Sequence, residues 1–337
     1  MNPIPGHRGA FVKTALKPDL FLLLLIGVMA AASLAPVSGV AADYVGKLAD
    51  LAIVLLFFLH GAKLSREAIR HGAGNWRLHL IVLGSTYALF PALGVALAAA
   101  CSGFVDPLLL SGLVFLTLVP STVQSSIAFT AIAGGNVAAA VCSASLSNLL
   151  GIFLTPLLVS LLMGADGTSI SFSSGSLRTI VLQLLIPFVA GHLLRPLIGT
   201  FLDRNKAIMQ PVDRGSVLLV VYSAFSAAVI EGIWTRVGGF DLVALLTLSA
   251  LILAVVMGTN LLVGRAIGMP REDRIVLLFC GSKKSLVSGV PMAGALFAPA
   301  QVGMVVLPLM IFHQLQLFVC AWLASRYHRE GQAPAAA

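Results

Sequence analysis

The chain has 337 residues, of which 58% are hydrophobic and only 10% are charged, and its mean hydropathy is +1.00. Because a soluble domain carries about 25% charged residues, this composition excludes a soluble fold and indicates a protein of the lipid bilayer. Basic residues outnumber acidic ones by 21 to 13, but their positions follow membrane topology, which excludes nucleic acid as a partner.

A membrane-spanning helix needs about 20 apolar residues, and ten stretches of the chain meet this need. The sequence therefore predicts an all-α polytopic membrane protein. Residues 1–18 are an N-terminal segment, 164–177 link the fifth and sixth spans, and 327–337 form a C-terminal tail. The predicted spans cover residues 19–38, 45–62, 78–101, 107–133, 136–163, 178–201, 212–233, 240–264, 274–297 and 304–325.

Basic residues alternate between the two sides of the predicted bundle. Fifteen lie on the side of the termini, in segments such as 8–17, 63–77 and 265–274, whereas only Lys47, Arg178 and Arg236 lie on the other. By the positive-inside rule, both termini are cytoplasmic and the linker 164–177 is extracytoplasmic. We expect a multi-pass protein of the plasma membrane, the inner membrane in a bacterium. His60 and Arg195 are expected to anchor helices at the cytoplasmic rim.

Two spans contain sequences that oppose a continuous helix. The fourth holds Val119–Ser126 with Pro120, within a stretch from Pro107 to Ala165 that lacks Asp, Glu, Lys and Arg; the ninth holds Gly281–Ser285. Irregular backbone at membrane depth is tolerated only where protein or a water-filled cavity satisfies it. Paired interruptions at matching places are typical of transporters with inverted repeats and a site at mid-membrane. The sequence predicts two inverted five-helix repeats, 19–163 and 178–326.

The second interruption places Lys283 and Lys284 about 15 Å from either end of their span, at 1.5 Å per residue. A charge at that depth costs about 2.5–3.5 kcal/mol or more. Each ammonium either caps carbonyl groups at the end of the first half-helix of span nine, or it has a function. The functional alternatives are to bind an anionic substrate or to replace a coupling cation.

Other polar residues near the interruptions are candidates for a substrate site. Ser125, Ser126 and Gln124 fall where the free N–H groups of a half-helix attract anions, although the hydroxyls could simply cap it. His313 and Gln316 share one helix face and either form an interhelical hydrogen bond or have a proton-linked role. The predicted substrate-binding residues are Lys283, Lys284, Ser282, Ser285, Gln124, Thr122, His313 and Gln316.

Rival functions remain open at this point. No Asp or Glu lies at mid-depth, which excludes aspartyl and metallo-type intramembrane proteases, and leaves Ser125 or Ser126 with His313 as the one enzymatic alternative. The four cysteines have no disulfide or metal-ligand spacing, and no cofactor is expected. A membrane sensor without turnover and an anion efflux carrier are further alternatives, and the oligomeric state stays open.

Four segments together resemble the bile acid:sodium symporter superfamily, in its SBF-like branch, which includes the vertebrate sodium/bile acid cotransporter 7. They are Leu118–Ser126, Gly135–Ala138, Leu146–Gly151 and Phe279–Leu286, and the resemblance covers about residues 17–327. It implies a core domain (spans three to five and eight to ten) that moves against a panel domain (spans one, two, six and seven). It also implies that spans four and nine cross at their unwound centres, and that the protein is a secondary transporter, not an enzyme.

The resemblance also implies sodium sites, which the chain matches only in part. Ser125, Ser126, Ser143, Ser145 and Asn148 correspond to oxygen ligands of one sodium, and Thr86 takes the place of a glutamine at a second.

In span nine the relatives carry a Glu and a Gln that contact sodium, whereas this chain has Cys280-Gly281-Ser282-Lys283-Lys284-Ser285 without an acid. Since an ammonium repels sodium, Lys284 is hypothesised to replace one cation. We therefore expect coupling to at most one sodium or a proton.

Overall fold

The computed structural model describes residues 20–63, 74–163 and 181–332. These residues are almost entirely helical and contain no β-strand beyond one isolated bridge between Ser102 and Val105. The predicted N-terminal segment 1–18 and most of the linker 164–177 lie outside the described residues. The described chain confirms the all-α class.

The helices begin and end close to the predicted spans. Eight of the described helices, counting interrupted ones as one, are long and apolar enough to cross a membrane, and two apolar helices are shorter. The last helix continues to residue 332, past the predicted end of span ten. The helices are α2 (Leu20–Leu34), α3 (Gly39–Lys63), α5 (Trp76–Gly84), η1 (Ser85–Leu89), α6 (Phe90–Ala100), α7 (Pro107–Leu118), α8 (Gln124–Ile132), α9 (Val137–Met163), η2 (Val181–Leu185), α11 (Ile186–Arg204), α12 (Lys206–Ile230), α13 (Ile233–Arg236), α14 (Gly239–Ala266), α15 (Arg271–Gly281), α16 (Leu286–Leu296) and α17 (Pro299–Gln332).

Both predicted interruptions are present. Helix α7 ends at Leu118 because Val119, the residue before Pro120, is extended (φ −75°, ψ 156°), as the proline ring disfavours the helical conformation there. The chain becomes helical again at Gln124. In the ninth span, α15 ends at Gly281, and Ser285 caps α16 by accepting a hydrogen bond from the Ser288 N–H.

Two π-helical turns are present: η1 interrupts the span that begins at Trp76, and η2 forms the first described turn of the span that continues as α11. Each immediately precedes a proline, Pro91 and Pro187, in the first turn of the next α-helix. Proline lacks the N–H that would bond the carbonyl four residues earlier, and its ring clashes with that carbonyl. In η1 the wider turn is closed by the Phe90 N–H, which donates to the Ser85 oxygen.

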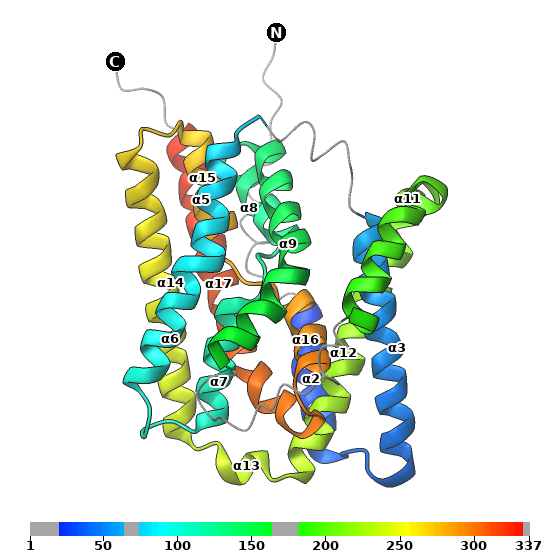
Figure 1. Ribbon diagram of the computed structural model, residues 1–337. Coiled ribbons are helices and arrows are strands. Elements are labelled where there is room, and N and C mark those ends of the chain that lie inside the picture. Colours follow the sequence, from blue (N-terminus) through cyan, green and yellow to red (C-terminus); the bar gives the residue numbers. More distant parts are fainter. Residues whose placement is uncertain (1–19, 64–73, 164–180, 333–337) are drawn as a thin grey trace, which may run out of the picture.

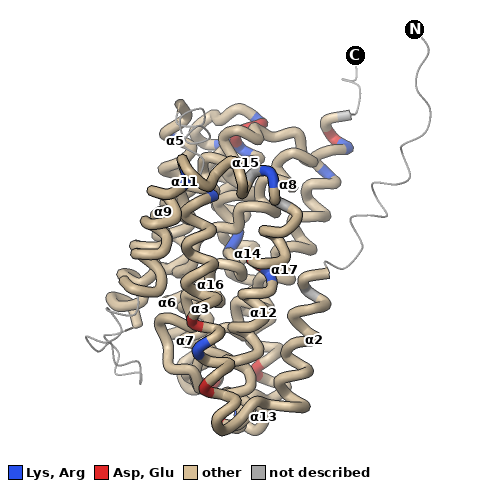
Figure 2. The backbone as a smooth tube through the Cα atoms, turned by 90° about the vertical axis from the view of Figure 1, so that its right-hand side faces the viewer, with Lys and Arg blue, Asp and Glu red and all other residues tan. Residues whose placement is uncertain are grey.

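The described helices fall into two packed groups (Figure 1). In the panel group, α3 packs on α11 and α12, and α12 packs on α2. The core group comprises α5 to α9 and α14 to α17, in which α7 packs on α17 and α15 on α14. Helices α16 and α17 contact α12 across the boundary. Figure 2 shows that charged positions concentrate toward the two ends of the helices, as expected in a bilayer.

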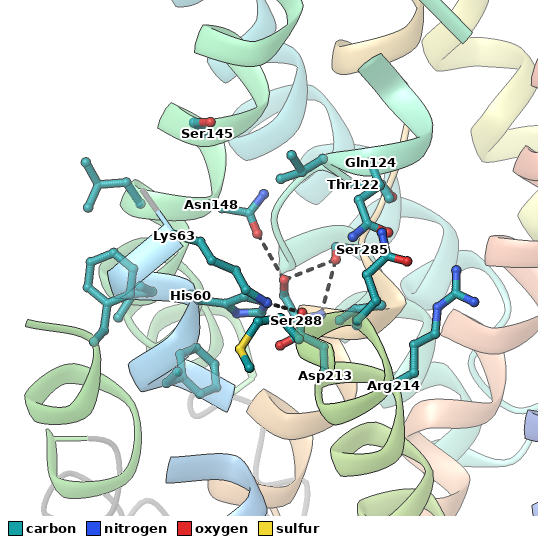
Figure 3. A pocket seen from close by; sticks show the side chains of 18 of the residues that line it. His60, Lys63, Thr122, Gln124, Ser145, Asn148, Asp213, Arg214, Ser285 and Ser288 are labelled. Atoms are coloured by element: carbon teal, nitrogen blue, oxygen red, sulfur yellow. Dashed lines mark hydrogen bonds and ion pairs between the residues drawn. The ribbon is translucent and has the colours of Figure 1, made fainter. Parts of the chain in front are cut away.

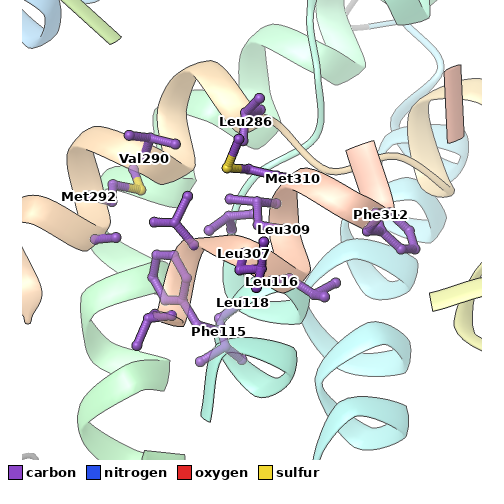
Figure 4. Packing of buried hydrophobic residues seen from close by; sticks show 14 of the residues in the cluster. Phe115, Leu116, Leu118, Leu286, Val290, Met292, Leu307, Leu309, Met310 and Phe312 are labelled. Atoms are coloured by element: carbon purple, nitrogen blue, oxygen red, sulfur yellow. The ribbon is translucent and has the colours of Figure 1, made fainter. Parts of the chain in front are cut away.

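Apolar side chains fill the space below the interruptions (Figure 4). Leucine, valine, methionine and phenylalanine side chains of α7, α16 and α17 interlock there. The rings of Phe115 and Phe297 meet edge to face at 5.2 Å, and those of Phe90 and Phe312 at 5.9 Å. This packing holds the two interrupted spans at a fixed position in the core group.

Gly61 of α3 and Gly191 of α11 allow these two helices to pack closely, because a Cβ at either position would overlap a backbone carbonyl of the other helix. A Cβ added at Gly61 would overlap the carbonyl group of Phe188, whereas one at Gly46, on the same helix, would meet no atom within 4 Å. We expect Gly61→Ala to lower the free energy of unfolding by about 1–3 kcal/mol through overpacking. Gly46→Ala should raise it by up to about 1 kcal/mol, because alanine favours the helix.

The measurement is thermal unfolding of both purified variants in detergent, followed by tryptophan fluorescence. Equal midpoints for the two variants would contradict the close contact at Gly61.

Candidate functional site

The two interruptions lie against each other and exchange hydrogen bonds. The Ser285 N–H donates to the Pro120 carbonyl at 2.8 Å. In return, hydroxyl groups from the first interruption and the start of α8 donate to carbonyl oxygens of span nine: Ser121 to Cys280 at 2.6 Å, Thr122 to Lys284 at 2.8 Å and Ser126 to Phe279 at 3.1 Å. The hydroxyl residues here therefore supply donors to two carbonyls at the end of α15, those of Phe279 and Cys280, and to the Lys284 carbonyl in the interruption itself.

The side chain of Lys284 is completely buried and its ammonium is surrounded by backbone oxygens. Nζ donates to the carbonyls of Thr117 at 2.7 Å, Thr86 at 2.8 Å and Val119 at 2.9 Å. It also lies 4.2 Å from the centre of the Phe90 ring. One predicted alternative was that the Lys284 ammonium caps the end of the first half-helix of span nine, which is α15. The ammonium instead caps the end of α7, the first half-helix of span four. The third carbonyl comes from the π-helical turn η1.

The backbone of Lys284 is held by span ten. The side-chain amide of Gln316 both accepts from the Lys284 N–H and donates to its carbonyl, each at 2.8 Å. His313 lies beside this amide, with Nδ1 2.9 Å from the Gln316 Nε2. Gln316 and His313 therefore form the expected interhelical hydrogen-bond network around the interruption.

Lys283 points in a different direction from Lys284 and is also completely buried. Its ammonium donates to the Ser125 hydroxyl and lies 4.5 Å from the centre of the Phe129 ring. One face of α8 therefore receives a positive charge at the position where the resemblance implies sodium ligands.

The remaining predicted ion-binding oxygens belong to separate networks. The Ser143 hydroxyl lies 2.7 Å from His79 Nδ1, and the Thr86 hydroxyl donates to the Val82 carbonyl. The Asn148 amide donates to the Ser121 carbonyl at 2.7 Å and accepts from the Ser288 hydroxyl at 2.9 Å. Each of these groups is thus already hydrogen-bonded within the protein.

A cavity of about 790 Å³ lies between the panel and core groups (Figure 3). Five predicted site residues line it: Thr122, Gln124, Ser145, Asn148 and Ser285. The other predicted site residues, including both lysines of span nine, do not. The apolar part of the wall consists of Phe57, Val123, Leu149, Ile152, Phe188, Leu202, Met209, Val287 and Met292.

Charged residues on the panel side of the cavity were missed as site residues. Lys63 at the end of α3 forms an ion pair with Asp213 of α12, and Arg195 and Arg214 also line the wall. Sequence reasoning assigned these basic residues to membrane topology or to the helix rim. The helical spacing of His60 and Lys63, which share one face of α3, is the signal that could have identified them.

On the core side, two half-helices begin at the cavity. Val123, the N-cap of α8, forms no side-chain capping hydrogen bond, and both it and Gln124 line the wall. Ser285, Val287 and Ser288 at the start of α16 line the same wall. The first N–H groups of a helix carry a partial positive charge of about half an elementary charge. The cavity is therefore electropositive on both sides, with one acidic residue among its described lining.

Comparison with known proteins agrees with this architecture. The model of the SBF-like CPA transporter family matches residues 19–329. YfeH of Escherichia coli strain K12, a proposed symporter, is 54% identical over 93% of this chain and 93% of its own. Sodium/bile acid cotransporter 7 of Mus musculus is 27% identical over 92% of this chain and 95% of its own, and that of Xenopus tropicalis is 28% identical over 92% and 94%. The names of these relatives are those of a proposed symporter and of sodium/bile acid cotransporters, and the matching family is a family of transporters.

The environment of Lys284 leads to a stability prediction. In Lys284→Met the side chain keeps its approximate length, but three buried carbonyls lose their donor, at a cost of about 1–3 kcal/mol each. Relief of the buried charge offsets part of this cost. We expect a net loss of about 3 kcal/mol or more in the free energy of unfolding.

The matched control is Lys283→Met, because Lys283 is equally buried but donates to a single hydroxyl. The Lys283→Met variant should lose clearly less free energy of unfolding than Lys284→Met. Chemical denaturation in detergent measures both, and a Lys284→Met protein as stable as the wild type would contradict the capping role.

Proposed function

Because this chain belongs to the SBF-like CPA transporter family, we propose that it is a secondary transporter that moves a small or amphipathic organic anion by alternating access. The core group would shift against the panel group around the cavity between them. We further propose that the chain crosses the membrane ten times as two inverted repeats. Both termini would be cytoplasmic, and the membrane would be the inner membrane of a bacterium.

The observation that carries the substrate class is the charge on the two walls of the cavity. The starts of α8 and α16 face it from the core, and Lys63, Arg195 and Arg214 face it from the panel, whereas Asp213 is the one acidic residue among the described residues of the lining. Helix N-termini and basic side chains both stabilise anions. A cationic solute would meet a repulsive wall on either side.

The apolar lining supports an amphipathic molecule. Two phenylalanine and two methionine side chains, with aliphatic residues between them, make up much of the wall. A ligand that buries an apolar body there gains about 25 cal/mol per Å², while its anionic group pairs with the polar part. The relatives named sodium/bile acid cotransporter 7 are consistent with such a substrate, because bile acids combine an apolar body with an anionic group.

For coupling, we propose that Lys284 supplies a permanent cation at a position where sodium-coupled relatives bind an ion. Three backbone oxygens around one ammonium resemble the oxygen shell that a hard cation requires. Lys283, next to Ser125, adds a second positive charge near the other set of predicted ligands. Coupling to at most one sodium or to a proton follows from this charge distribution.

The anion proposal predicts a specific transport defect. Taurocholate uptake into proteoliposomes should be saturable, and Lys63→Gln should raise its KM by about 10- to 100-fold, since a hydrogen bond to a charged group contributes about 1.5–3 kcal/mol. Lys47→Gln is the matched control, because Lys47 lies on the same helix but is exposed away from the cavity.

Uptake of organic cations with no uptake of any organic anion would overturn the substrate class. Equal KM values for Lys63→Gln and Lys47→Gln would show that Lys63 does not bind the substrate.

The coupling proposal predicts a weak sodium response. A unit positive charge 4 Å from a sodium ion repels it by about 4 kcal/mol at an effective dielectric constant of 20, which weakens binding by nearly three decades. Transport at fixed pH, with sodium varied against choline, should therefore show a Hill coefficient of at most one.

Lys284→Gln should make transport more responsive to sodium. A Hill coefficient near two in the wild type, or an unchanged sodium response in Lys284→Gln, would refute the replacement of a cation by Lys284.

A further inference from the structure

Asp213 is an unusual residue within the cavity wall. It is the only carboxylate in the described lining, it is 8% exposed, and it lies on α12 in the panel group. Lys63 donates to its Oδ2, whereas its Oδ1 is buried and has no hydrogen-bond partner among the described residues. A half-satisfied carboxylate in a protein interior is a costly arrangement, which needs a reason.

The stability of the Asp213 carboxylate depends on Lys63. Of the two oxygens, only the one facing Lys63 is compensated. The Lys63 side chain is 32% exposed and lies in the cavity beside His60 (Figure 3). Because Lys63 is partly exposed, its ammonium can move from Asp213 to an anion in the cavity. The more deeply buried Asp213 carboxylate has less access to water that could replace the ammonium.

The other charged or titratable groups around Asp213 come from three helices. His60 and Lys63 on α3, Arg195 on α11 and Arg214 on α12 itself line the cavity, and His192 is a further histidine of α11 outside this lining. Helices α2 and α16, which also pack on α12, contain no charged or titratable residue, and no residue of α17 is part of the cavity lining. Of these described groups, Lys63 is the one that the structure shows donating a hydrogen bond to Asp213.

We propose that Asp213 is the proton carrier of this transporter, and that Lys63 alternates between Asp213 and the anionic substrate. This inference rests on the proposed function. When the substrate's anionic group pairs with Lys63, the Asp213 carboxylate loses its partner and takes one proton from water. When the substrate leaves on the other side, Asp213 returns that proton to water and pairs with Lys63 again. Lys63 stays charged throughout, and one proton accompanies each anionic group.

A first experiment needs no ligand. Lys63→Gln removes the partner of Asp213 permanently and should therefore leave Asp213 protonated at neutral pH. Infrared spectra of the purified full-length protein should show a carboxylic-acid C=O band in Lys63→Gln that is absent from the wild type and from Lys63→Gln/Asp213→Asn. The double variant also avoids an uncompensated charge, so misfolding of the single variant would be recognised. No band in a folded Lys63→Gln protein overturns the inference.

A second experiment measures proton uptake with taurocholate, whose sulfonate stays ionised at all pH values used. In weakly buffered solution, the wild type should take up one proton for each bound taurocholate, as linkage requires. Asp213→Asn should bind taurocholate without proton uptake, and at least as tightly. Glu231→Gln, an exposed acid at the other end of α12, should behave as the wild type does.

Taurocholate binding without proton uptake in the wild type, or undiminished uptake in Asp213→Asn, overturns the proton role while leaving the anion transporter intact. Absence of taurocholate binding to every variant counts against the proposed substrate class. In that case the infrared band still tests whether Asp213 becomes protonated when it loses Lys63.

Discussion

The hydrogen-bonding requirement of backbone groups in a medium without water is the constraint on which this structure depends. A span that unwinds at mid-membrane frees the carbonyls at the end of one half-helix and the N–H groups at the start of the next. Here two such spans lie together, and each supplies hydrogen-bond partners to some of the free backbone groups of the other. Ser285 donates to Pro120, Ser121 to Cys280, and Ser126 to Phe279. Each interruption therefore depends on the other for part of its hydrogen bonding.

Lys284 is a buried amine that connects several helices of this arrangement. Its ammonium joins η1 to the end of α7, while its backbone is bound to α17 through Gln316. A buried charge in general does not stabilise a fold by itself. The three carbonyls that it serves lie in η1, which precedes Pro91, and at the end of α7, next to Pro120. The lysine thus donates hydrogen bonds to backbone carbonyls close to the two prolines.

The helices and both interruptions could be predicted from sequence because their signals are local. Apolar runs give the spans, and Pro120 and the residues Gly281–Ser285 mark the breaks. The partners of Lys284 could not be predicted, since they are backbone carbonyls of Thr86, Thr117 and Val119 and leave no trace in side-chain chemistry.

The cavity was also beyond sequence reasoning. Lys63 and Arg214 look the same whether they mark the cytoplasmic end of a helix or face inward, and Asp213 pairs with a lysine 150 positions away in the chain. Only the packing of α3 against α12 decides between these alternatives. For the same reason, the sequence places Lys283 and Lys284 in the interruption of span nine but does not give their direction relative to the cavity.

The tethering of the ammonium at Lys284 has an electrical consequence. A carrier that binds a dissolved cation gains charge when it loads and loses that charge when it unloads, so its empty form returns neutral. A cation attached to the main chain by a lysine side chain would instead move with the core group in both directions of the proposed cycle, as long as the amine is protonated. The membrane potential, worth about 2.3 kcal/mol per elementary charge per 100 mV across the full bilayer, then acts on the empty carrier as well as on the loaded one. In such a carrier the voltage would regulate how fast the empty binding site returns.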